Sequence, residues 1–307
     1  MTLPPGFSPN GWIILDKPHG LGSTQAVAAV KRNLREAGYG KKVKVGHGGT
    51  LDPLASGVLP IALGEATKLA GRMLDASKIY QFTVAFGAET DTLDLEGKVI
   101  AESDARPERA AFDAVLPRFT GPIEQVPPAY SALMVGGERA YDLARKGEAV
   151  ELKSRAVTIH ELEVLAFSPE AATFVAHVSK GTYIRSLARD IARALGTLGH
   201  VTYLHRIKAG PFGIDRAISL DKLNEVGKGA RLENVLLPLE AGLVDIPALD
   251  LGPEQARAVR QGRVLAGLPF DDGLYWVRAG TVPVALVELS GGSLIVARGF
   301  NLSDVAE

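Results

Sequence analysis

The sequence predicts an α+β protein with a main body built on a mixed sheet, followed by a small β-rich C-terminal domain. Strand-like and helix-like segments alternate irregularly, without the tight repeat of a doubly wound parallel sheet. At 307 residues the chain is long for one domain. Near residues 237–252 the pattern changes to closely spaced strand segments. We therefore expect one domain over 1–240 and a second over 245–307.

The body begins with a strand and a helix. Residues 11–17 (GWIILDK) predict a short buried strand, because apolar side chains dominate them. Ser23 or Thr24 can cap the helix that follows to about residue 37. Its inward-facing side chains are expected to be Val27, Val30 and Leu34.

Three segments follow a loop rich in Gly and Lys. Residues 57–64 contain too much Gly, Pro and β-branched side chain for a helix interior, and they predict a strand. Residues 65–76 predict a helix. Apolar and polar side chains alternate over 78–87, which is typical of a strand with one face made by Tyr80, Phe82, Val84 and Phe86.

The remaining elements continue the mixed pattern. We expect helices over 107–119 and 182–196, a strand over 173–181, and an extended segment punctuated by Pro and Gly over 121–137. Beyond the boundary, a short helix and three strand segments indicate a compact β-rich unit: 253–262, 274–280, 282–289 and 293–299.

The composition excludes several kinds of site. The chain has no cysteine, so it can form no disulfide, thiolate zinc site, iron–sulfur cluster or cysteine nucleophile. Its six histidines show no H-x-H or H-x-x-x-H pair, and we expect no metal. No apolar run approaches the length of a membrane span, and the N-terminus lacks the features of a signal peptide. We expect a cytoplasmic protein that has no membrane partner.

The net charge of −1 conceals two basic stretches. Residues 31–44 and 180–208 each contain six Lys or Arg against one acidic residue, whereas 89–104 is acidic. Either basic cluster alone is typical of a solvated surface. Two of them flanking a glycine-rich loop favour a groove for a polyanion.

That loop, GHGGTLDPLASGVLP over residues 46–60, presents one carboxylate, Asp52. Pro53 keeps Asp52 out of the helical region, and the glycines allow a backbone or ligand to approach closely, which suits a nucleophile or a base. Asp52 could instead cap a helix, but Gly57 and Pro60 follow too soon for a good one. The loop lacks the lysine of a phosphate-binding P-loop and the third glycine of a dinucleotide fingerprint.

Other residues stand out, each with a simpler alternative. Arg185 lies in the first turn of its predicted helix, where the dipole disfavours a cation, so an anionic partner such as Asp52 is expected. Tyr80 is by default a core aromatic, and His47 a loop residue. No second carboxylate with a clear motif accompanies Asp52, which argues against a two-carboxylate glycosidase. One carboxylate, one cation and one aromatic suit a redox-neutral rearrangement on a nucleic acid, without a cofactor.

The loop resembles the motif of the TruB family of tRNA pseudouridine synthases. The resemblance continues in the family's order through LDKPHGLGST, KIYQFTVAFGAETDTLDLEG, QVPPAYSAL, KGTYIRSLARDIARALG and VTYLHR, and covers most of residues 11–215. It implies a pseudouridine-synthase catalytic domain and a C-terminal PUA-like RNA-binding domain. It also implies isomerisation of uridine 55 in the TΨC loop of tRNA, without metal, cofactor or guide RNA, by a protein that we expect to be a monomer.

The resemblance assigns three catalytic positions. Asp52 matches the nucleophilic aspartate, for which attack on C6 of the uracil and attack on C1′ of the ribose both remain open. Arg185 matches the arginine that pairs with this aspartate. Tyr80 matches the tyrosine that stacks on the target base and is a candidate for proton abstraction.

Four more positions match substrate-binding residues. Tyr183 and Leu204 match residues that line the uridine pocket. His47 matches the histidine that helps to hold the RNA loop open around a flipped base. Lys17 matches the lysine of the N-terminal LDKP motif, for which a structural role and a phosphate-facing role are both open.

The chain departs from residues common in the family at four positions: Gly22, Gly48, Met134 and His205. The two glycines are expected to adjust loop flexibility. Met134 and His205 remove basic groups, so the affinity for tRNA is expected to be weaker or distributed differently.

Three rival functions remain open. The first is an RNA-binding or tRNA-folding protein with the same fold. The second is a synthase that depends on a guide RNA. The third is a nucleoside glycosidase, which would release free uracil.

Overall fold

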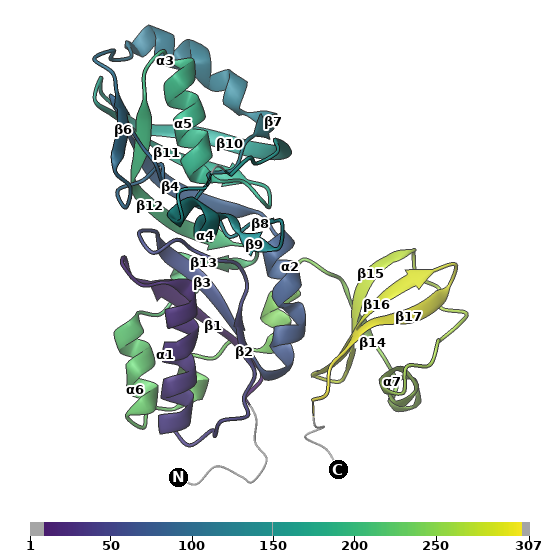
Figure 1. Ribbon diagram of the computed structural model, residues 1–307. Helices are drawn as coiled ribbons and strands as arrows, with labels where there is room; N and C mark the ends of the chain where they lie inside the picture. Colours follow the sequence, from purple (N-terminus) through teal and green to yellow (C-terminus); the bar gives the residue numbers. More distant parts are fainter. Residues whose placement is uncertain (1–8, 149, 303–307) are drawn as a thin grey trace.

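A mixed sheet forms the centre of the protein in the computed structural model, which describes residues 9–148 and 150–302 (Figure 1). Its strands are β1 (Gly11–Lys17), β2 (Val45–His47), β3 (Ser56–Leu63), β4 (Lys78–Phe86), β7 (Gly121–Gln125), β10 (Arg155–Phe167), β11 (Ala171–Val178), β12 (Gly199–Ala209) and β13 (Phe212–Gly213). The main order is β1-β3-β12-β4-β11-β10-β7, with β2 beside β3 and β13 beside β12. Every pair is antiparallel except β12 with β3, so the predicted mixed sheet is confirmed.

Helices pack against this sheet in two groups, each over its own hydrophobic cluster. Helices α1 (Ser23–Glu36) and α6 (Leu220–Gly227) pack on the half formed by β1 and β3. Helices α3 (Arg109–Val115) and α5 (Ile184–Ala194) pack on the half formed by β4, β10 and β11. Tyr80 and Leu204 contact both clusters, so they mark the junction between the two halves.

The N-terminal region follows the predicted order, with local differences. Helix α1 is capped by Gly22 rather than by Ser23 or Thr24, because Gln25 reaches back to accept a hydrogen bond from the Gly22 N–H. Val27 is only half-buried, whereas Val30 is buried as expected.

Several predicted helices divide into a 3-10 turn and a short α-helix. Residues 65–76 become the 3-10 helix η1 (Gly64–Leu69) followed by α2 (Ala70–Asp75). Helix α3 likewise continues into the 3-10 helix η2 (Leu116–Phe119). Three short 3-10 helices lie before the C-terminal sheet: η3 (Ile214–Arg216), η4 (Leu232–Asn234) and η5 (Leu239–Gly242).

Two hairpins belong to connections between strands of the central sheet. Strands β5 (Ala88–Thr90) and β6 (Val99–Glu102) form the first, in the connection from β4 to β7. Strands β8 (Met134–Val135) and β9 (Glu138–Arg139), followed by α4 (Ala140–Arg145), form the second, between β7 and β10. Both connections contact the first turn of α5, through the Thr92 and Tyr130 carbonyls.

The C-terminal part contains a separate four-stranded sheet in the order β14-β15-β16-β17. Its elements are β14 (Ala248–Asp250), α7 (Pro253–Arg260), β15 (Gly273–Ala279), β16 (Val282–Ser290) and β17 (Ser293–Gly299). The predicted β-rich unit is therefore present, with a hydrophobic cluster of its own. Trp276 and Phe300 belong to a cluster that also contains Trp12 of β1, so apolar packing joins this sheet to the body.

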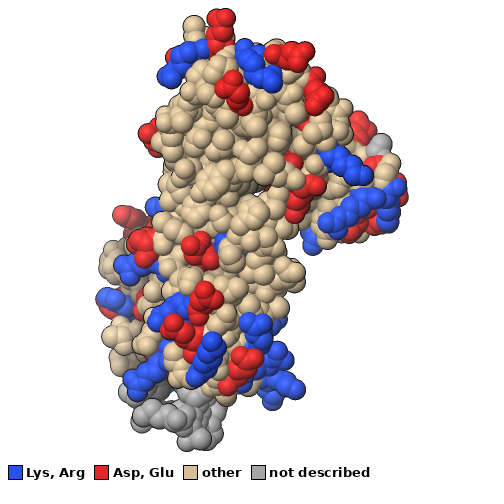
Figure 2. Space-filling model, turned by 90° about the vertical axis from the view of Figure 1, so that its left-hand side faces the viewer, with Lys and Arg blue, Asp and Glu red and all other residues tan. Residues whose placement is uncertain are grey.

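Charged side chains are unevenly distributed over the face drawn in Figure 2. Figure 2 shows a face on which Lys and Arg gather with Asp and Glu over the lower half, while the middle of the upper half is almost free of charge. No helix in the described ranges is long and apolar enough to cross a membrane.

Candidate active site

Asp52 lies in a turn that leads directly into β3, and no helix follows it. The Ala55 N–H donates to the Asp52 carbonyl, and β3 begins at Ser56. The helix-capping alternative is therefore wrong. The turn leaves the carboxylate accessible: 37% of the Asp52 side chain is exposed.

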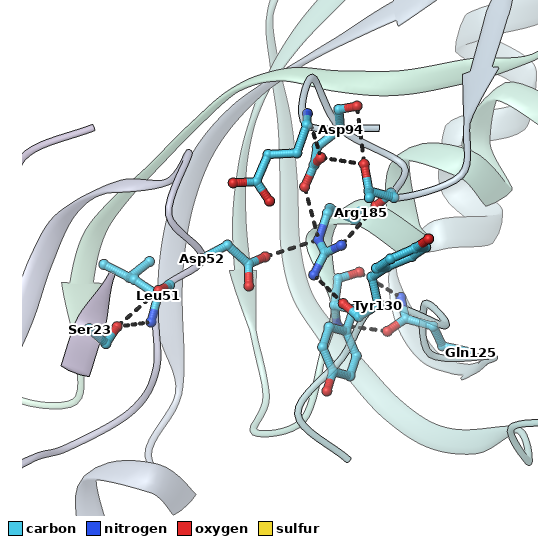
Figure 3. Close-up of polar contacts among 10 residues, drawn as sticks. Ser23, Leu51, Asp52, Asp94, Gln125, Tyr130 and Arg185 are labelled. Atoms are coloured by element: carbon cyan, nitrogen blue, oxygen red, sulfur yellow. Dashed lines mark hydrogen bonds and ion pairs between the residues drawn. The ribbon is translucent and has the colours of Figure 1, made fainter. Parts of the chain in front are cut away.

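The residues on both sides of Asp52 are held by hydrogen bonds to their backbone. Ser23 Oγ donates to the Leu51 carbonyl at 2.9 Å and accepts from the Leu51 N–H at 2.8 Å. On the other side, the Gly20 N–H donates to the Pro53 carbonyl at 2.8 Å. Ser23, expected as a helix cap, thus fixes the loop that carries Asp52 (Figure 3).

Arg185 faces Asp52 from the first turn of α5, as Figure 3 shows. Its Nε lies 2.9 Å from Asp52 Oδ2, without the alignment of a hydrogen bond, so the contact is an ion pair. Only 6% of the Arg185 side chain is exposed. A buried cation at a helix N-terminus is unfavourable by itself, and the carboxylate offsets that cost.

The other nitrogens of Arg185 bind two loops. Nη1 donates to the Thr92 carbonyl at 2.7 Å, and Nη2 donates to the Tyr130 carbonyl at 2.9 Å. These carbonyls belong to the β5–β6 connection and to the segment after β7. One guanidinium therefore joins three segments that are distant in sequence, and its orientation toward Asp52 is set by fixed backbone groups.

Asp94 is a second carboxylate beside Arg185, although the sequence offers no clear motif that pairs it with Asp52. Its Oδ2 lies 3.6 Å from Arg185 Nε. Its Oδ1 accepts hydrogen bonds from Thr92 Oγ1 at 2.6 Å and from the Glu96 N–H at 3.0 Å. With 9% of its side chain exposed and both oxygens engaged, Asp94 is placed to orient Arg185 rather than to serve as a glycosidase acid.

A pocket opens beside the ion pair between Asp52 and Arg185. Its lining consists of Asp52, Leu54, Ala55, Asp94, Leu95, Arg185 and residues 201–204. Glu96 lies near this acidic group: burial first, and then the charges of Asp94 and Asp52, raise its pKa. The site thus combines apolar walls with carboxylates that share one arginine.

Tyr80 and Leu204 lie together at the junction between the two halves of the sheet. Tyr80 of β4 pairs with Arg206 of β12, and Leu204 pairs with Phe82, so these side chains share one face. Leu204 lines the pocket. Tyr80 is half-buried against both clusters and does not belong to the pocket lining that the described residues form.

Tyr183 is the N-cap residue of α5, and its backbone is held by one side chain. The Tyr183 N–H donates to Gln125 Oε1 at 2.8 Å, and Gln125 Nε2 donates to the Tyr183 carbonyl at 3.1 Å. The Arg155 guanidinium lies over the Tyr183 ring, 4.8 Å from its centroid. Like Tyr80, Tyr183 is half-buried and lies outside the described pocket lining.

His47 ends β2, five residues before Asp52. It is half-buried and pairs with Ile61 of β3. Burial, and then the positive charge of Arg206, lower the pKa of His47. The surroundings of His47 therefore disfavour the protonated imidazole in the protein without RNA.

Lys17 is fully buried, which corrects its assignment as a substrate-binding residue. Its Nζ donates to the carbonyls of Pro18, Leu21 and Pro53, at 3.1, 2.6 and 3.3 Å. Of the two roles left open by the sequence, the structure supports the structural one. Lys17 supports the loop at Pro53, next to Asp52.

The buried ammonium of Lys17 predicts a pH dependence of stability. Burial lowers its pKa from 10.5 to about 8, against the attraction of Asp52 and with a smaller contribution from Arg206. Between these values the unfolded chain binds more protons than the folded one, so stability rises with pH. From pH 7.5 to 9.5 the free energy of unfolding should rise by about 2 kcal/mol more in the wild type than in Lys17→Met, as measured by urea denaturation. Equal pH slopes would contradict this account.

The basic stretch 180–208 is less available for RNA than its composition indicates. Arg185 and Arg206 are buried. Lys180, Arg189 and Arg193 form ion pairs with Asp75, Asp190 and Glu89. In contrast, the six basic side chains of the stretch 31–44 are all exposed.

Sequence reasoning missed Asp94, the carbonyls that bind Arg185 and the strand β12. Asp94 lies in the acidic stretch 89–104, whose TDTLD pattern was the available signal. The backbone carbonyls have no side-chain signature. Within the described residues, no group of three His, Asp or Glu is arranged to hold a metal ion.

Comparison with protein families gave two matches that are adjacent in the chain. Residues 35–184 match the TruB family pseudouridylate synthase (N terminal domain). Residues 185–244 match the tRNA pseudouridylate synthase B C-terminal domain.

Among curated proteins, the chain is similar to enzymes named tRNA pseudouridine synthase B. It is 75% identical over 303 residues to that of Novosphingobium aromaticivorans, with 97% of this chain and 99% of the relative covered. It is 59% identical to that of Zymomonas mobilis, with 98% and 100% covered.

Two solved structures are similar over most of their length. One is an H/ACA RNP bound to a substrate RNA containing 2′-deoxyuridine, with a TM-score of 0.72, 26% identity, and 96% of this chain and 86% of that chain covered. The other is a Cbf5-Nop10-Gar1 complex, with a TM-score of 0.72, 27% identity, and 98% and 91% covered.

Proposed function

Because this chain belongs to the TruB family of pseudouridylate synthases, and is thus an enzyme that isomerises uridine to pseudouridine, we propose that it acts on uridine 55 in the TΨC loop of tRNA with Asp52 as nucleophile. The observation that carries the role of Asp52 is its geometry. Its backbone is held on both sides, and its exposed carboxylate faces the buried Arg185. A nucleophile needs an anionic oxygen that is both fixed and reachable.

The proposed reaction moves bonds without changing composition. The N1–C1′ bond breaks, a C5–C1′ bond forms, one proton leaves C5 and one is bound at N1. Asp52 attacks either C6 of the uracil or C1′ of the ribose. Arg185 stabilises the carboxylate when the adduct breaks, and Tyr80 stacks on the base and takes the C5 proton. Electrons and atoms balance, so the reaction needs no oxidant, reductant or cofactor.

The target base must leave its stack to reach Asp52. A stacked base hides its reacting atoms, and extruding it requires a pocket with apolar or aromatic walls. Leu204 lines the pocket beside Asp52, and Tyr80 lies close to it at the junction of the two halves. We assign Tyr183 and His47 to the same binding region. The exposed stretch 31–44 contacts the RNA phosphates.

We further propose that the enzyme acts alone, as a cytoplasmic monomer that needs no guide RNA. Relatives named tRNA pseudouridine synthase B are 75% and 59% identical, whereas the RNP structures are 26% and 27% identical. We also propose two domains: a catalytic domain over 1–240 and a PUA-like RNA-binding domain over 245–307. Neither matched family model extends beyond residue 244, and the C-terminal part has a separate sheet and a hydrophobic cluster of its own.

Tritium release tests the proposal directly. An unmodified tRNA transcript tritiated at C5 of its uridines is mixed with the purified protein and EDTA, without cofactor or guide RNA. We expect release of about one equivalent per tRNA, since only the C5 hydrogen of the converted uridine is lost. Loss of free uracil from the RNA would indicate a glycosidase instead. No release from folded protein that still binds tRNA would overturn the proposal.

A further inference from the structure

Arg206 is almost completely buried, yet it has no carboxylate partner in the described part of the chain. Its exposed fraction is 1%. Nε donates to the Val58 carbonyl at 2.7 Å, Nη1 to the Thr50 carbonyl at 3.2 Å, and Nη2 to the Gly49 carbonyl at 3.1 Å. Its charge is thus compensated by backbone dipoles.

The three carbonyls lie on both limbs of the loop that carries Asp52. Gly49 and Thr50 precede Asp52, and Val58 follows it in β3. A guanidinium is planar and its N–H groups point in fixed directions, so it can hold both limbs at a set separation. An ammonium group is a compact point charge on a flexible stem and cannot reproduce this fork.

The backbone of Arg206 also contacts the loop closely. Arg206 pairs with Gly57 in the parallel contact between β12 and β3. Gly57 has a φ of +100°, and a Cβ added there would lie 2.3 Å from the Arg206 carbonyl oxygen, so only glycine fits. On its other side, Arg206 pairs with Tyr80 of β4. The residue therefore lies between the Asp52 loop and the strand that carries Tyr80.

We propose that Arg206 is a positioning residue, which holds the Asp52 loop at its working distance from Tyr80 and Arg185. The proposal rests on the role of Asp52 given above. Arg206 acts through the loop backbone and need not touch the RNA.

Charge and geometry can be separated at this position. Burial, together with the charge of Arg206, lowers the pKa of Lys78, and the same two influences act on Lys17, where Asp52 opposes them. Removing the charge of Arg206 would thus also change the pKa values of Lys17 and Lys78. Arg206→Lys keeps the charge and removes the fork, so it tests the geometry alone.

The test measures the single-turnover rate of tritium release separately from tRNA affinity. For Arg206→Lys we expect the rate to fall about 10²-fold, the scale expected when reacting groups are displaced by about 1 Å. The dissociation constant for tRNA should stay within about twofold, because the exposed basic stretch 31–44 is unchanged. Amide hydrogen exchange over 48–55 should become faster, which reports the loop independently of activity.

Phe112→Leu is the matched control for a general loss of stability. Phe112 lies on the buried face of α3, in the cluster on the α5 half of the sheet. This variant should melt at a lower temperature while keeping the wild-type rate and loop exchange at 20 °C.

The outcomes separate this inference from the proposed function. A wild-type rate in Arg206→Lys, or an equal loss of rate in Phe112→Leu, would overturn the role of Arg206. So would a loss confined to tRNA affinity. If Arg206→Lys does not fold, amide hydrogen exchange of the wild-type protein tests the inference. Amides over 48–55 that exchange as fast as those of an exposed loop would overturn it. Failure of the wild type to release tritium would overturn the proposed function instead.

Discussion

Asp52→Asn is expected to lower the single-turnover rate of tritium release by about 10⁴-fold or more. Asparagine keeps the shape of the side chain but has no anionic oxygen to attack the uridine. The affinity for tRNA should remain within a few-fold of the wild type, because Asp52 lies in the pocket and the exposed cations of the stretch 31–44 are unchanged. Enzyme in excess over tritiated tRNA gives the rate, and filter binding gives the affinity.

Asp113→Asn is the matched control for this prediction. Asp113 is an exposed aspartate of α3 that pairs with Arg109. Its replacement should change neither quantity. A rate for Asp52→Asn within about tenfold of the wild type would exclude Asp52 as nucleophile. The same variant tests the alternative of a tRNA-folding protein: refolding of misfolded tRNA at the wild-type level would show a folding activity independent of Asp52.

Arg185→Lys is expected to lower the rate by about 10²- to 10³-fold, because an ammonium group cannot reproduce the planar fork that reaches two separate loop carbonyls and faces Asp52. It should also destabilise the fold. The Thr92 and Tyr130 carbonyls would lose their donors, and an unsatisfied buried acceptor costs about 1–3 kcal/mol. We therefore expect the free energy of unfolding in urea to fall by about 2 kcal/mol or more.

Arg193→Lys provides the comparison on the same helix. Arg193 lies two turns later in α5, is 55% exposed and pairs with Glu89. Its substitution should leave the rate unchanged and alter stability by less than about 1 kcal/mol. Equal rates for Arg185→Lys and Arg193→Lys would contradict the proposed role of Arg185 in the reaction. A fall in rate without any loss of stability would mean that the two carbonyl contacts contribute little to folding.

The elements with strong local signals were predicted well from the sequence. Strand β4 shows the alternation of a half-buried strand, and α5 shows an apolar stripe at helical spacing. The C-terminal strands β15, β16 and β17 stand between Gly-rich turns. Each signal is contained in about ten neighbouring residues, so it can be recognised without any knowledge of the fold.

The contacts between the site residues were harder to predict from the sequence. Arg185 suggested an anionic partner because it lies at a helix N-terminus, and the structure places Asp52 there. The same reasoning could not find Asp94, because its acidic surroundings resemble a solvated segment. Nor could it show that Lys17 points into the protein, since a lysine at the end of a strand is usually exposed.

The sequence by itself determined the secondary-structure periods, the Gly- and Pro-rich turn around Asp52, and the resemblance to a family. Only the tertiary structure decided which groups meet. Arg185 bonds to carbonyls 93 and 55 residues away, and Arg206 bonds to carbonyls about 150 residues away. Propensity and periodicity act over a few neighbouring residues, whereas these contacts exist only after strands distant in sequence pair and exclude water. Burial then leaves each cation dependent on whichever carbonyl or carboxylate the fold brings beside it.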